Sequence, residues 1–217
     1  MKVGTDGVLV GAWSFIPASG HILDIGSGTG LIALMAAQRS LDATIDAIEI
    51  EESAFHQCKE NIANSPWGSR CNVIQGSIFD YYPEKKYNCI LCNPPFFVKS
   101  LKNPGQERTL ARHCTNGFDH KALLDHVMTN LLDKDGLFSL ILPVTEAQTL
   151  ITYAQNCNIG ISRITHILSF PNEAPIRYLM EFTHNQPHST NENDFILYDS
   201  KNIRSTEYNK LMQDFYL

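Results

Sequence analysis

Four consecutive residues, Asn93-Pro94-Pro95-Phe96, combine groups that suit chemistry on an amine. The Asn93 side-chain oxygen and the Pro94 carbonyl can each accept one hydrogen of an NH2 group. Two such bonds hold the amine in line with a methyl donor and stabilise the positive charge that develops on nitrogen. The prolines restrict the backbone that carries the acceptors, and Phe96 can stack on a planar substrate. This loop therefore predicts methyl transfer to an exocyclic amine, against the alternative of a plain proline turn with a core phenylalanine.

A glycine-rich segment, residues 24–30 (DIGSGTG), predicts a cofactor site at a turn from a strand into a helix. Its glycines, which allow the backbone to approach a ligand closely, are Gly26, Gly28 and Gly30. Leu31 stands where a dinucleotide-binding motif has its third glycine, which disfavours a pyrophosphate. S-adenosylmethionine has no phosphates and fits better. Glu49, at the end of the next expected strand, is placed to accept hydrogen bonds from the ribose hydroxyls, and Asp24 belongs to the same site.

These motifs need a scaffold that brings strand ends together, and the chain predicts an α/β domain of that kind. From residue 21 onward, short apolar runs alternate with segments in which apolar residues recur every three or four positions. The expected strands are residues 21–25, 44–50, 72–75, 87–92, 136–142, 161–170 and 177–182. The expected helices are residues 31–39, 53–64, 120–132, 145–156 and 205–216, and residues 186–194 are expected as a polar turn. The prediction is one Rossmann-like domain, residues 1–217, with a mostly parallel sheet of seven strands flanked by helices.

Size and composition predict a cytoplasmic globular protein without metal or membrane anchor. The 217 residues suffice for a core, and 43% hydrophobic and 18% charged residues exclude a largely disordered chain. No apolar run reaches the roughly 20 residues that span a bilayer, and no signal-peptide pattern is present. Cys89 and Cys92 lie three apart in an expected strand, so they point to opposite faces and are not expected to share a zinc ion. His120 and His126 do not align on one helix face and are expected to be solvated or partly buried.

The segment that follows the catalytic loop, about residues 94–118, is expected to face the substrate. The net charge of the whole chain is −6, which opposes binding to phosphate groups. Between Asn93 and His113, four basic residues and one acidic residue give +3, which leaves −9 for the remainder. These charged residues are Lys99, Lys102, Arg108, Arg112 and Glu107. The local positive charge is expected to compensate for the acidic chain, although a solvated surface loop would carry a similar pattern.

Taken together, the residues resemble the bacterial tRNA(Val) adenine-N(6) methyltransferase family, a branch of the Rossmann-like methyltransferases. The resemblance covers nearly the whole chain. It is carried by residues 1–13 (MKVGTDGVLVGAW), the glycine motif, residues 93–97 (NPPFF), residues 111–113 (ARH) and residues 214–217 (DFYL). The first and last of these blocks are specific to that family.

The resemblance implies methylation of the adenine immediately 3′ of the anticodon of a valine tRNA, with the base turned out into the pocket. It implies cofactor contacts at Lys2, Thr5, Ser77 and Ile78, in addition to Asp24, Glu49, Asn93 and the glycine turn. The implied contacts with the anticodon stem and loop are Phe97, Lys99, Arg108, Arg112 and His113. A monomer is expected.

Two features depart from the family pattern. Many relatives have an acid near Ser77 that accepts the adenine amine of the cofactor, and a serine replaces it only weakly. Relatives also carry an aromatic and basic segment before the Met1 block, so this sequence begins at a position internal to the family pattern, and whether part of an RNA-binding surface is missing stays open. Three other functions remain open: N-methylation of a protein glutamine amide, methylation of DNA adenine, and an RNA-binding module that retains the fold without turnover.

Overall fold

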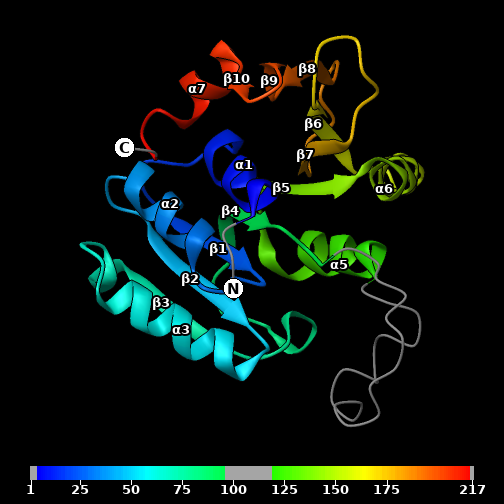
Figure 1. Cartoon of the computed structure of the whole chain (residues 1–217). Helices are drawn as coiled ribbons and strands as arrows, with labels where there is room; N and C mark the ends of the chain where they lie inside the picture. Colours follow the sequence, from blue (N-terminus) through cyan, green and yellow to red (C-terminus); the bar gives the residue numbers. More distant parts are fainter. Residues whose placement is uncertain (1–3, 96–118, 216–217) are drawn as a thin grey trace, which may run out of the picture.

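The computed structural model describes residues 4–95 and 119–215 and contains one large sheet with helices on both faces (Figure 1). The strands are β1 (His21–Ile25), β2 (Thr44–Glu49), β3 (Cys71–Gln75), β4 (Tyr87–Cys92), β5 (Leu132–Pro143), β6 (Gly160–Leu168), β7 (Arg177–Thr183), β8 (Asn191–Ile196), β9 (Tyr198–Ser200) and β10 (Ile203–Arg204). The helices are α1 (Thr5–Trp13), α2 (Leu31–Arg39), α3 (Glu52–Ala63), α5 (His120–His126), α6 (Val144–Asn156) and α7 (Thr206–Met212). Short helical turns cover Gly68–Arg70 and Ile78–Asp80, and α5 continues as a π turn over Val127–Leu131.

The large sheet has eight strands in the order β3-β2-β1-β4-β5-β7-β6-β8, and β9 pairs with β10 in a small second sheet. Strands β1 to β5 are mutually parallel, β7 runs antiparallel between β5 and β6, and β8 is parallel to β6. The predicted mostly parallel α/β sheet is confirmed. Its eighth strand, β8, begins at Asn191, inside the stretch expected as a turn, so that local prediction was wrong. The first four residues of β8 are exposed, and edge pairing of the backbone does not require an apolar pattern.

Two hydrophobic clusters lie on opposite faces of the sheet. Residues of α1, α2, α3 and α7 belong to the first cluster, and residues of α5, the π turn and α6 belong to the second (Figure 1). Cys89 is part of the first cluster and Cys92 is part of the second. The two thiols therefore face opposite sides of β4, as the alternation of side chains along a strand predicts.

The first helix, α1, has no counterpart among the expected elements. Every residue from Gly7 to Trp13 is buried, so the helix lacks the polar face whose period would have revealed it. It packs beside α2, where a Cβ on Gly11 would come within 2.7 Å of Met35 Sδ. A side chain at Gly11 would therefore require the Met35 side chain to shift.

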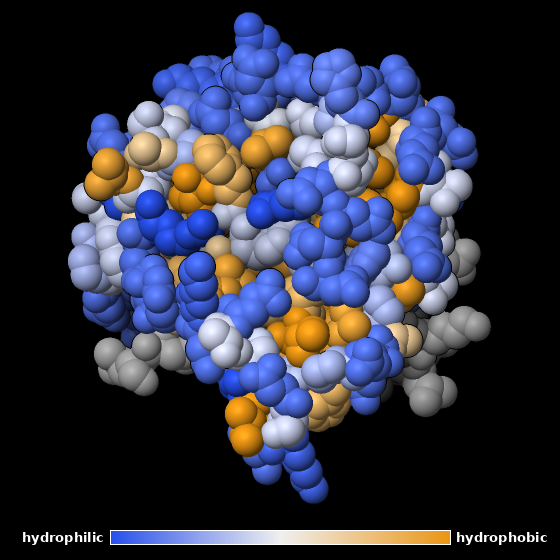
Figure 2. Space-filling view, turned by 90° about the horizontal axis from the view of Figure 1, so that it is seen from above, coloured by the Kyte–Doolittle hydropathy of each residue, from blue (hydrophilic) through white to orange (hydrophobic). Residues whose placement is uncertain are grey.

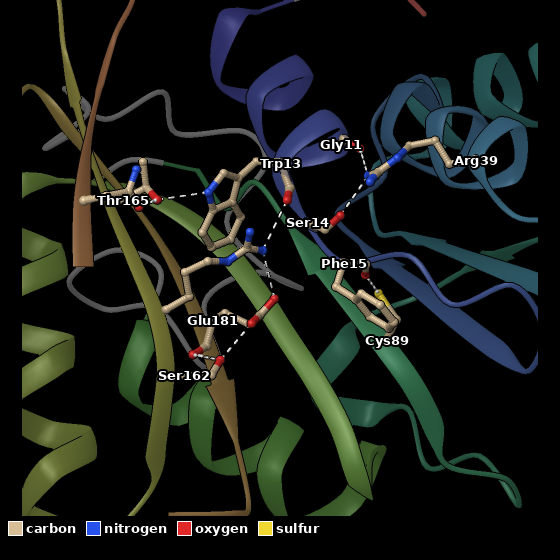
Figure 3. Close-up of polar contacts among 11 residues, drawn as sticks. Gly11, Trp13, Ser14, Phe15, Arg39, Cys89, Ser162, Thr165 and Glu181 are labelled. Carbon is tan, nitrogen blue, oxygen red and sulfur yellow. Dashed lines mark hydrogen bonds and ion pairs between the residues drawn. The ribbon is translucent and has the colours of Figure 1, made fainter. Parts of the chain in front are cut away.

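Polar contacts at the end of α1 hold this helix to the sheet (Figure 3). The Trp13 indole donates to Thr165 Oγ1 at 3.0 Å, and the Arg163 guanidinium lies 3.6 Å from the centre of the Trp13 ring. Arg163 also pairs with the buried Glu181 at 3.1 Å. From the other side, Arg39 donates to the Gly11 carbonyl at 2.7 Å. These contacts tie the last turn of α1 to β6, β7 and α2.

Figure 2 shows the face that carries β8, β9, β10 and α7 as mostly hydrophilic, with hydrophobic residues in several separate patches. Such a mixture is ordinary for a solvated protein surface. Within residues 4–95 and 119–215, no helix is long and apolar enough to cross a membrane. The same residues contain no group of three or more His, Cys, Asp or Glu side chains placed to hold a metal ion.

Candidate active site

Those predicted site residues that the structure describes come together because four neighbouring parallel strands end at one edge of the sheet. The order β3-β2-β1-β4 places the ends of these strands side by side. The glycine turn follows β1, Glu49 closes β2, Ser77 follows β3 and Asn93 follows β4. Ligands of open α/β sheets bind at this carboxyl edge.

The turn between β1 and α2 carries three glycines with positive φ angles. Gly26, Gly28 and Gly30 have φ of 68°, 56° and 86°, a region that residues with a Cβ rarely adopt. The Gly26 amide donates to the Ile48 carbonyl at 2.9 Å, which ties the turn to β2. A Cβ on Gly26 would have no neighbour within 4 Å, whereas one on Gly30 would come within 2.8 Å of Cys58 Sγ. Gly26 therefore borders open space, and Gly30 allows the turn to pack on α3.

Glu49 lies beside this turn and is held there by backbone amides. Its side chain is nearly buried, with Oε2 accepting the Gly28 amide at 2.8 Å and Oε1 accepting the Glu51 amide at 2.9 Å. A carboxylate has about four acceptor positions, so these two bonds leave capacity for more. The structure thus brings the residue predicted to bind a ribose next to the predicted cofactor turn.

Asp24 is fully buried near the end of β1 and supports the turn from within the protein. Its Oδ2 accepts the Ala33 amide at 3.0 Å and so satisfies one of the free amides in the first turn of α2. Its Oδ1 has no hydrogen-bond partner among the residues that the structure describes. Burial raises the pKa of Asp24 to about 7; the Ala33 bond opposes this shift and the nearby Glu49 adds to it. A cation bound at the turn would favour the ionised carboxylate.

Asn93 follows β4 directly and presents an unused acceptor. Its Oδ1 is buried and, within the described part of the chain, has no hydrogen-bond partner. On the other side of the amide, a Cβ on Gly7 would lie 3.6 Å from Asn93 Nδ2, so α1 packs against this side chain. Pro94 is buried and Pro95 is exposed. A buried acceptor without a donor costs about 1–3 kcal/mol, which a ligand N–H would recover.

Ser77 and Ile78 lie at the end of β3, next to β2. The Ser77 hydroxyl accepts the Phe79 amide at 3.2 Å and so caps the helical turn that begins at Ile78. Ile78 is 7% exposed, and a Cβ on Gly76 would meet nothing within 4 Å. The backbone at Gly76 therefore borders open space, while the Ser77 oxygen already serves its own turn.

The start of α1 reaches the same edge of the sheet. Thr5 is exposed at the first position of α1, and the adjacent Asp6 accepts a hydrogen bond from Arg177 Nε at 3.0 Å. Arg177 opposes Pro143 at the end of β5, so this ion pair anchors α1 to the carboxyl edge. The remaining predicted residues lie outside the described part of the chain: Lys2, Phe96, Phe97, Lys99, Lys102, Arg108, Arg112 and His113.

Sequence reasoning did not select His120 as a residue of interest near the loop that follows β4. His120 is 6% exposed, and burial lowers its pKa, a shift that Glu146, the Pro95 backbone and Asp119 oppose. His120 and His126 were expected to be solvated or partly buried, and this prediction was wrong, because both are buried, with 6% and 8% exposure. The only signal in the sequence was its position at the start of a helix, directly after the segment expected to face the substrate.

The strand order and the glycine turn between β1 and α2 define a class I methyltransferase. Known structures agree with this fold. A protein from Agrobacterium tumefaciens described as a predicted O-methyltransferase matches with a TM-score of 0.70 at 15% identity, covering 96% of both chains. TrmK of M. capricolum, bound to S-adenosyl-homocysteine, matches with a TM-score of 0.58 at 13% identity, covering 84% of this chain and 70% of that one.

Sequence comparison identifies the family within that class. Residues 8–133 match the family model of the methyltransferase small domain. The tRNA1(Val) (adenine(37)-N6)-methyltransferase of Bacteroides thetaiotaomicron is 41% identical over all of this chain and 91% of its own length. The protein of the same name from Pedobacter heparinus is 39% identical over all of this chain and 92% of its own length. The chain belongs to the tRNA1(Val) (adenine(37)-N6)-methyltransferase family.

Proposed function

We propose that this protein methylates the 6-amino group of adenine 37 in tRNA1(Val), with S-adenosylmethionine as the methyl donor. Membership in the family supports the reaction and the substrate, because the relatives carry this activity in their names. The observation that carries the chemistry is the buried Asn93 Oδ1, an acceptor without a partner in the described residues, at the carboxyl edge of the sheet. An amine N–H is the kind of group that this position would accept.

The residues around the glycine turn fit S-adenosylmethionine. The open space at Gly26 and Gly76 leaves room for a ligand along the backbone, and Glu49 keeps acceptor capacity for ribose hydroxyls. Asp24 supplies a buried carboxyl group near the glycine turn. The positive charge of a bound sulfonium or ammonium group would favour the ionised form of this carboxyl group. Bound there, the cofactor would supply an electrophilic methyl group on a sulfonium. The remaining proposed cofactor contacts are Lys2, Thr5, Ser77 and Ile78. Ser77 would contribute through its backbone and through the helical turn that its side chain caps.

The residues after β4 would position the amine. Asn93 Oδ1 and the Pro94 carbonyl each accept one N–H, so the nitrogen lone pair is directed at the methyl carbon. These acceptors would stabilise the positive charge that develops on nitrogen as it takes the methyl group. One amine proton would then leave to solvent, and the bound cofactor would supply the methyl group while retaining the C–S bonding pair. Phe96 would stack on the base that carries the amine.

Positive residues after the loop are proposed to bind the anticodon stem and loop. Phe97, Lys99, Arg108, Arg112 and His113 belong to the segment whose local charge opposes the acidic remainder of the chain. Guanidinium and ammonium groups there would contact phosphates, while His113 could stack on a base.

The direct test incubates the protein with labelled S-adenosylmethionine and tRNA from a strain that lacks the matching modification. We expect label in N6-methyladenosine at position 37 of tRNA1(Val) only, mapped by nuclease digestion and mass spectrometry. A glutamine-containing protein and adenine-containing DNA, assayed in parallel, represent the two rival amines. Label in either of these without label in tRNA would overturn the proposal.

A further inference from the structure

An ion pair at the carboxyl edge of the sheet joins two segments that are far apart in the sequence. Asp6, in the first turn of α1, accepts a hydrogen bond from Arg177 Nε at 3.0 Å across a separation of 171 residues. The guanidinium is also held by its own backbone, because Nη1 donates to the Ile176 carbonyl at 2.8 Å. The side chains of Arg177 and Asp6 are 29% and 20% exposed, so water and salt screen this pair only in part.

The first turn of α1 lies between the two halves of the proposed active site. A Cβ on Gly7, the residue after Asp6, would lie 3.6 Å from Asn93 Nδ2 and 3.7 Å from Leu31 Cδ2. Asn93 begins the proposed amine-binding loop, and Leu31 directly follows the glycine turn that is proposed to bind the cofactor. Because the backbone at Gly7 packs against both side chains, the position of this turn affects the spacing between the amine-binding loop and the glycine turn.

The sheet connects Arg177 back to Asn93. Arg177 opposes Pro143 where β7 pairs with β5, and β5 in turn pairs with β4, whose last residue precedes Asn93. The Asp6–Arg177 pair and the packing at Gly7 therefore close a ring of contacts through β4, β5, β7 and α1. The steps between the strands consist of backbone hydrogen bonds, which a substitution leaves in place. The step from β7 to α1 contains the ion pair, which a single substitution can remove.

We propose that Asp6 and Arg177 are positioning residues, which hold the first turn of α1 where it sets the spacing between the amine-binding loop and the glycine turn. This inference rests on the proposed function, since it assigns the pair to the geometry of the same site. Neither side chain touches the amine or the methyl group in this proposal. The pair should therefore affect turnover more than the binding of either ligand.

The chain offers conservative variants and a matched control. Asp6→Asn keeps the shape of the side chain without its charge, Arg177→Gln removes the guanidinium, and Arg177→Lys keeps a positive charge that can still pair with Asp6. Arg163 pairs with Glu181 at 3.1 Å and donates to the carbonyl of Trp13, the last residue of α1. Glu181→Gln therefore weakens an ion pair of the same kind near the opposite end of the same helix.

The first experiment measures kcat, the KM for tRNA and the Kd for S-adenosylmethionine in folded full-length variants. For Asp6→Asn and Arg177→Gln we expect kcat to fall by about tenfold with KM and Kd within about threefold, as for a small misplacement of reacting groups. The double variant should lose no more than about threefold beyond the weaker single variant, because both substitutions break one interaction. Wild-type kcat in both single variants, or losses that multiply in the double variant, would overturn the proposal.

The conservative variant and the control separate positioning from general stability. Arg177→Lys should keep kcat within about threefold of wild type, because the opposite charges remain. Glu181→Gln should lower the thermal unfolding midpoint but leave kcat unchanged. An equal loss of kcat in Glu181→Gln and Asp6→Asn would overturn the proposal, because turnover would then follow the stability of the protein.

Hydrogen exchange gives a second readout that does not depend on catalysis. In the first turn of α1, Val8 N donates to the Gly4 carbonyl at 3.3 Å. Amide exchange in this turn should be about tenfold faster in Asp6→Asn and Arg177→Gln than in wild type or Glu181→Gln, because the turn opens more readily. Either variant suffices if the other does not fold. Unchanged exchange would overturn the proposal, whereas absence of N6-methyladenosine with the wild-type protein would instead refute the proposed function.

Discussion

At the scale of single residues, the proposed site consists of polar side chains. The sequence shows where these residues stand along the chain but not which groups form hydrogen bonds with them. Asn93, Asp24 and Glu49 could be selected from the sequence because each follows or ends an expected strand next to a motif. The burial and the hydrogen bonds of these residues could not be predicted in this way, because they result from contacts between segments that are distant in the sequence. His120 illustrates the limit, because its burial at the first position of α5 results from tertiary contacts that the local sequence does not show.

The unpartnered oxygen of Asn93 leads to the first prediction. Asn93→Ala should lower kcat by about two to three powers of ten, because one acceptor for the charged transition state is lost. The Kd for S-adenosylmethionine, measured by isothermal titration, should stay within a few fold of wild type. Asn72→Ala, on the exposed side of β3, serves as the control and should keep full turnover. Unchanged kcat in Asn93→Ala would remove Asn93 from the proposed mechanism.

Asp24 leads to a prediction about stability and pH in the ligand-free protein. Its pKa is about 7 in the folded state against 3.8 for an ordinary aspartate. Between these pH values the folded state holds a proton that the unfolded state has released, so the free energy of unfolding decreases as pH rises. The loss due to this residue is about 4 kcal/mol and is complete above pH 7, because one pKa unit corresponds to roughly 1.4 kcal/mol.

Urea unfolding of wild type and Asp24→Asn at several pH values between 4.5 and 8 tests this. The variant should be more stable than wild type at pH 8, and the difference should shrink as pH falls, because the substituted amide never has to ionise inside the protein. Asp42→Asn, at an exposed position, is the matched control and should follow wild type throughout. A constant difference between wild type and Asp24→Asn across this range would show that Asp24 does not titrate as described.

At the scale of elements, predictability followed the strength of the local pattern. Strands β1 and β4 were predicted with their observed ends, because continuous apolar runs next to glycine or proline turns mark buried parallel strands. Helix α1 was not predicted, because it is buried on all sides from Gly7 to Trp13 and shows no amphipathic period. Strand β8 was not predicted either, because an edge strand can be polar when its backbone pairs with a neighbour. Tertiary contacts, which no local window contains, decided both cases.

The position of α1 against Asn93 gives a prediction for this helix as a unit. A Cβ at Gly7 would sit at 3.6 Å from Asn93 Nδ2 and 3.7 Å from a Leu31 methyl group, which is ordinary contact. Gly7→Ala should therefore keep near-wild-type turnover, whereas the larger branched side chain in Gly7→Val should displace Asn93 and lower kcat by at least about tenfold. Thermal unfolding measured on both variants separates this effect from loss of the fold. Equal kcat in the two variants would show that α1 does not determine the position of Asn93.

At the scale of the whole molecule, the sheet separates two hydrophobic clusters and gathers the chemistry at one edge. The order β3-β2-β1-β4 makes the ends of β1 and β4 neighbours. The glycine turn after β1 and the proposed amine-binding loop that begins at Asn93 therefore lie side by side. We propose that substrate recognition depends on the segment after β4 and on the overall charge. An acidic chain with a net charge of −6 should bind RNA through few phosphate contacts, all of them local.

This charge distribution predicts a shallow dependence of tRNA binding on salt, dominated by the residues after the amine loop. Each phosphate contact contributes a slope of roughly −0.7 to −0.9 to log K against log salt concentration, so about three or four contacts give a slope near −3. Replacing Arg108 and Arg112 with glutamine should weaken binding and reduce the slope by about two. The matched control, Lys59→Gln with Lys210→Gln, changes the net charge equally but on α3 and α7, where both residues are exposed. An equal change of slope in both double variants would contradict this prediction. It would mean that tRNA binding depends on the net charge of the protein and not on the positions of Arg108 and Arg112.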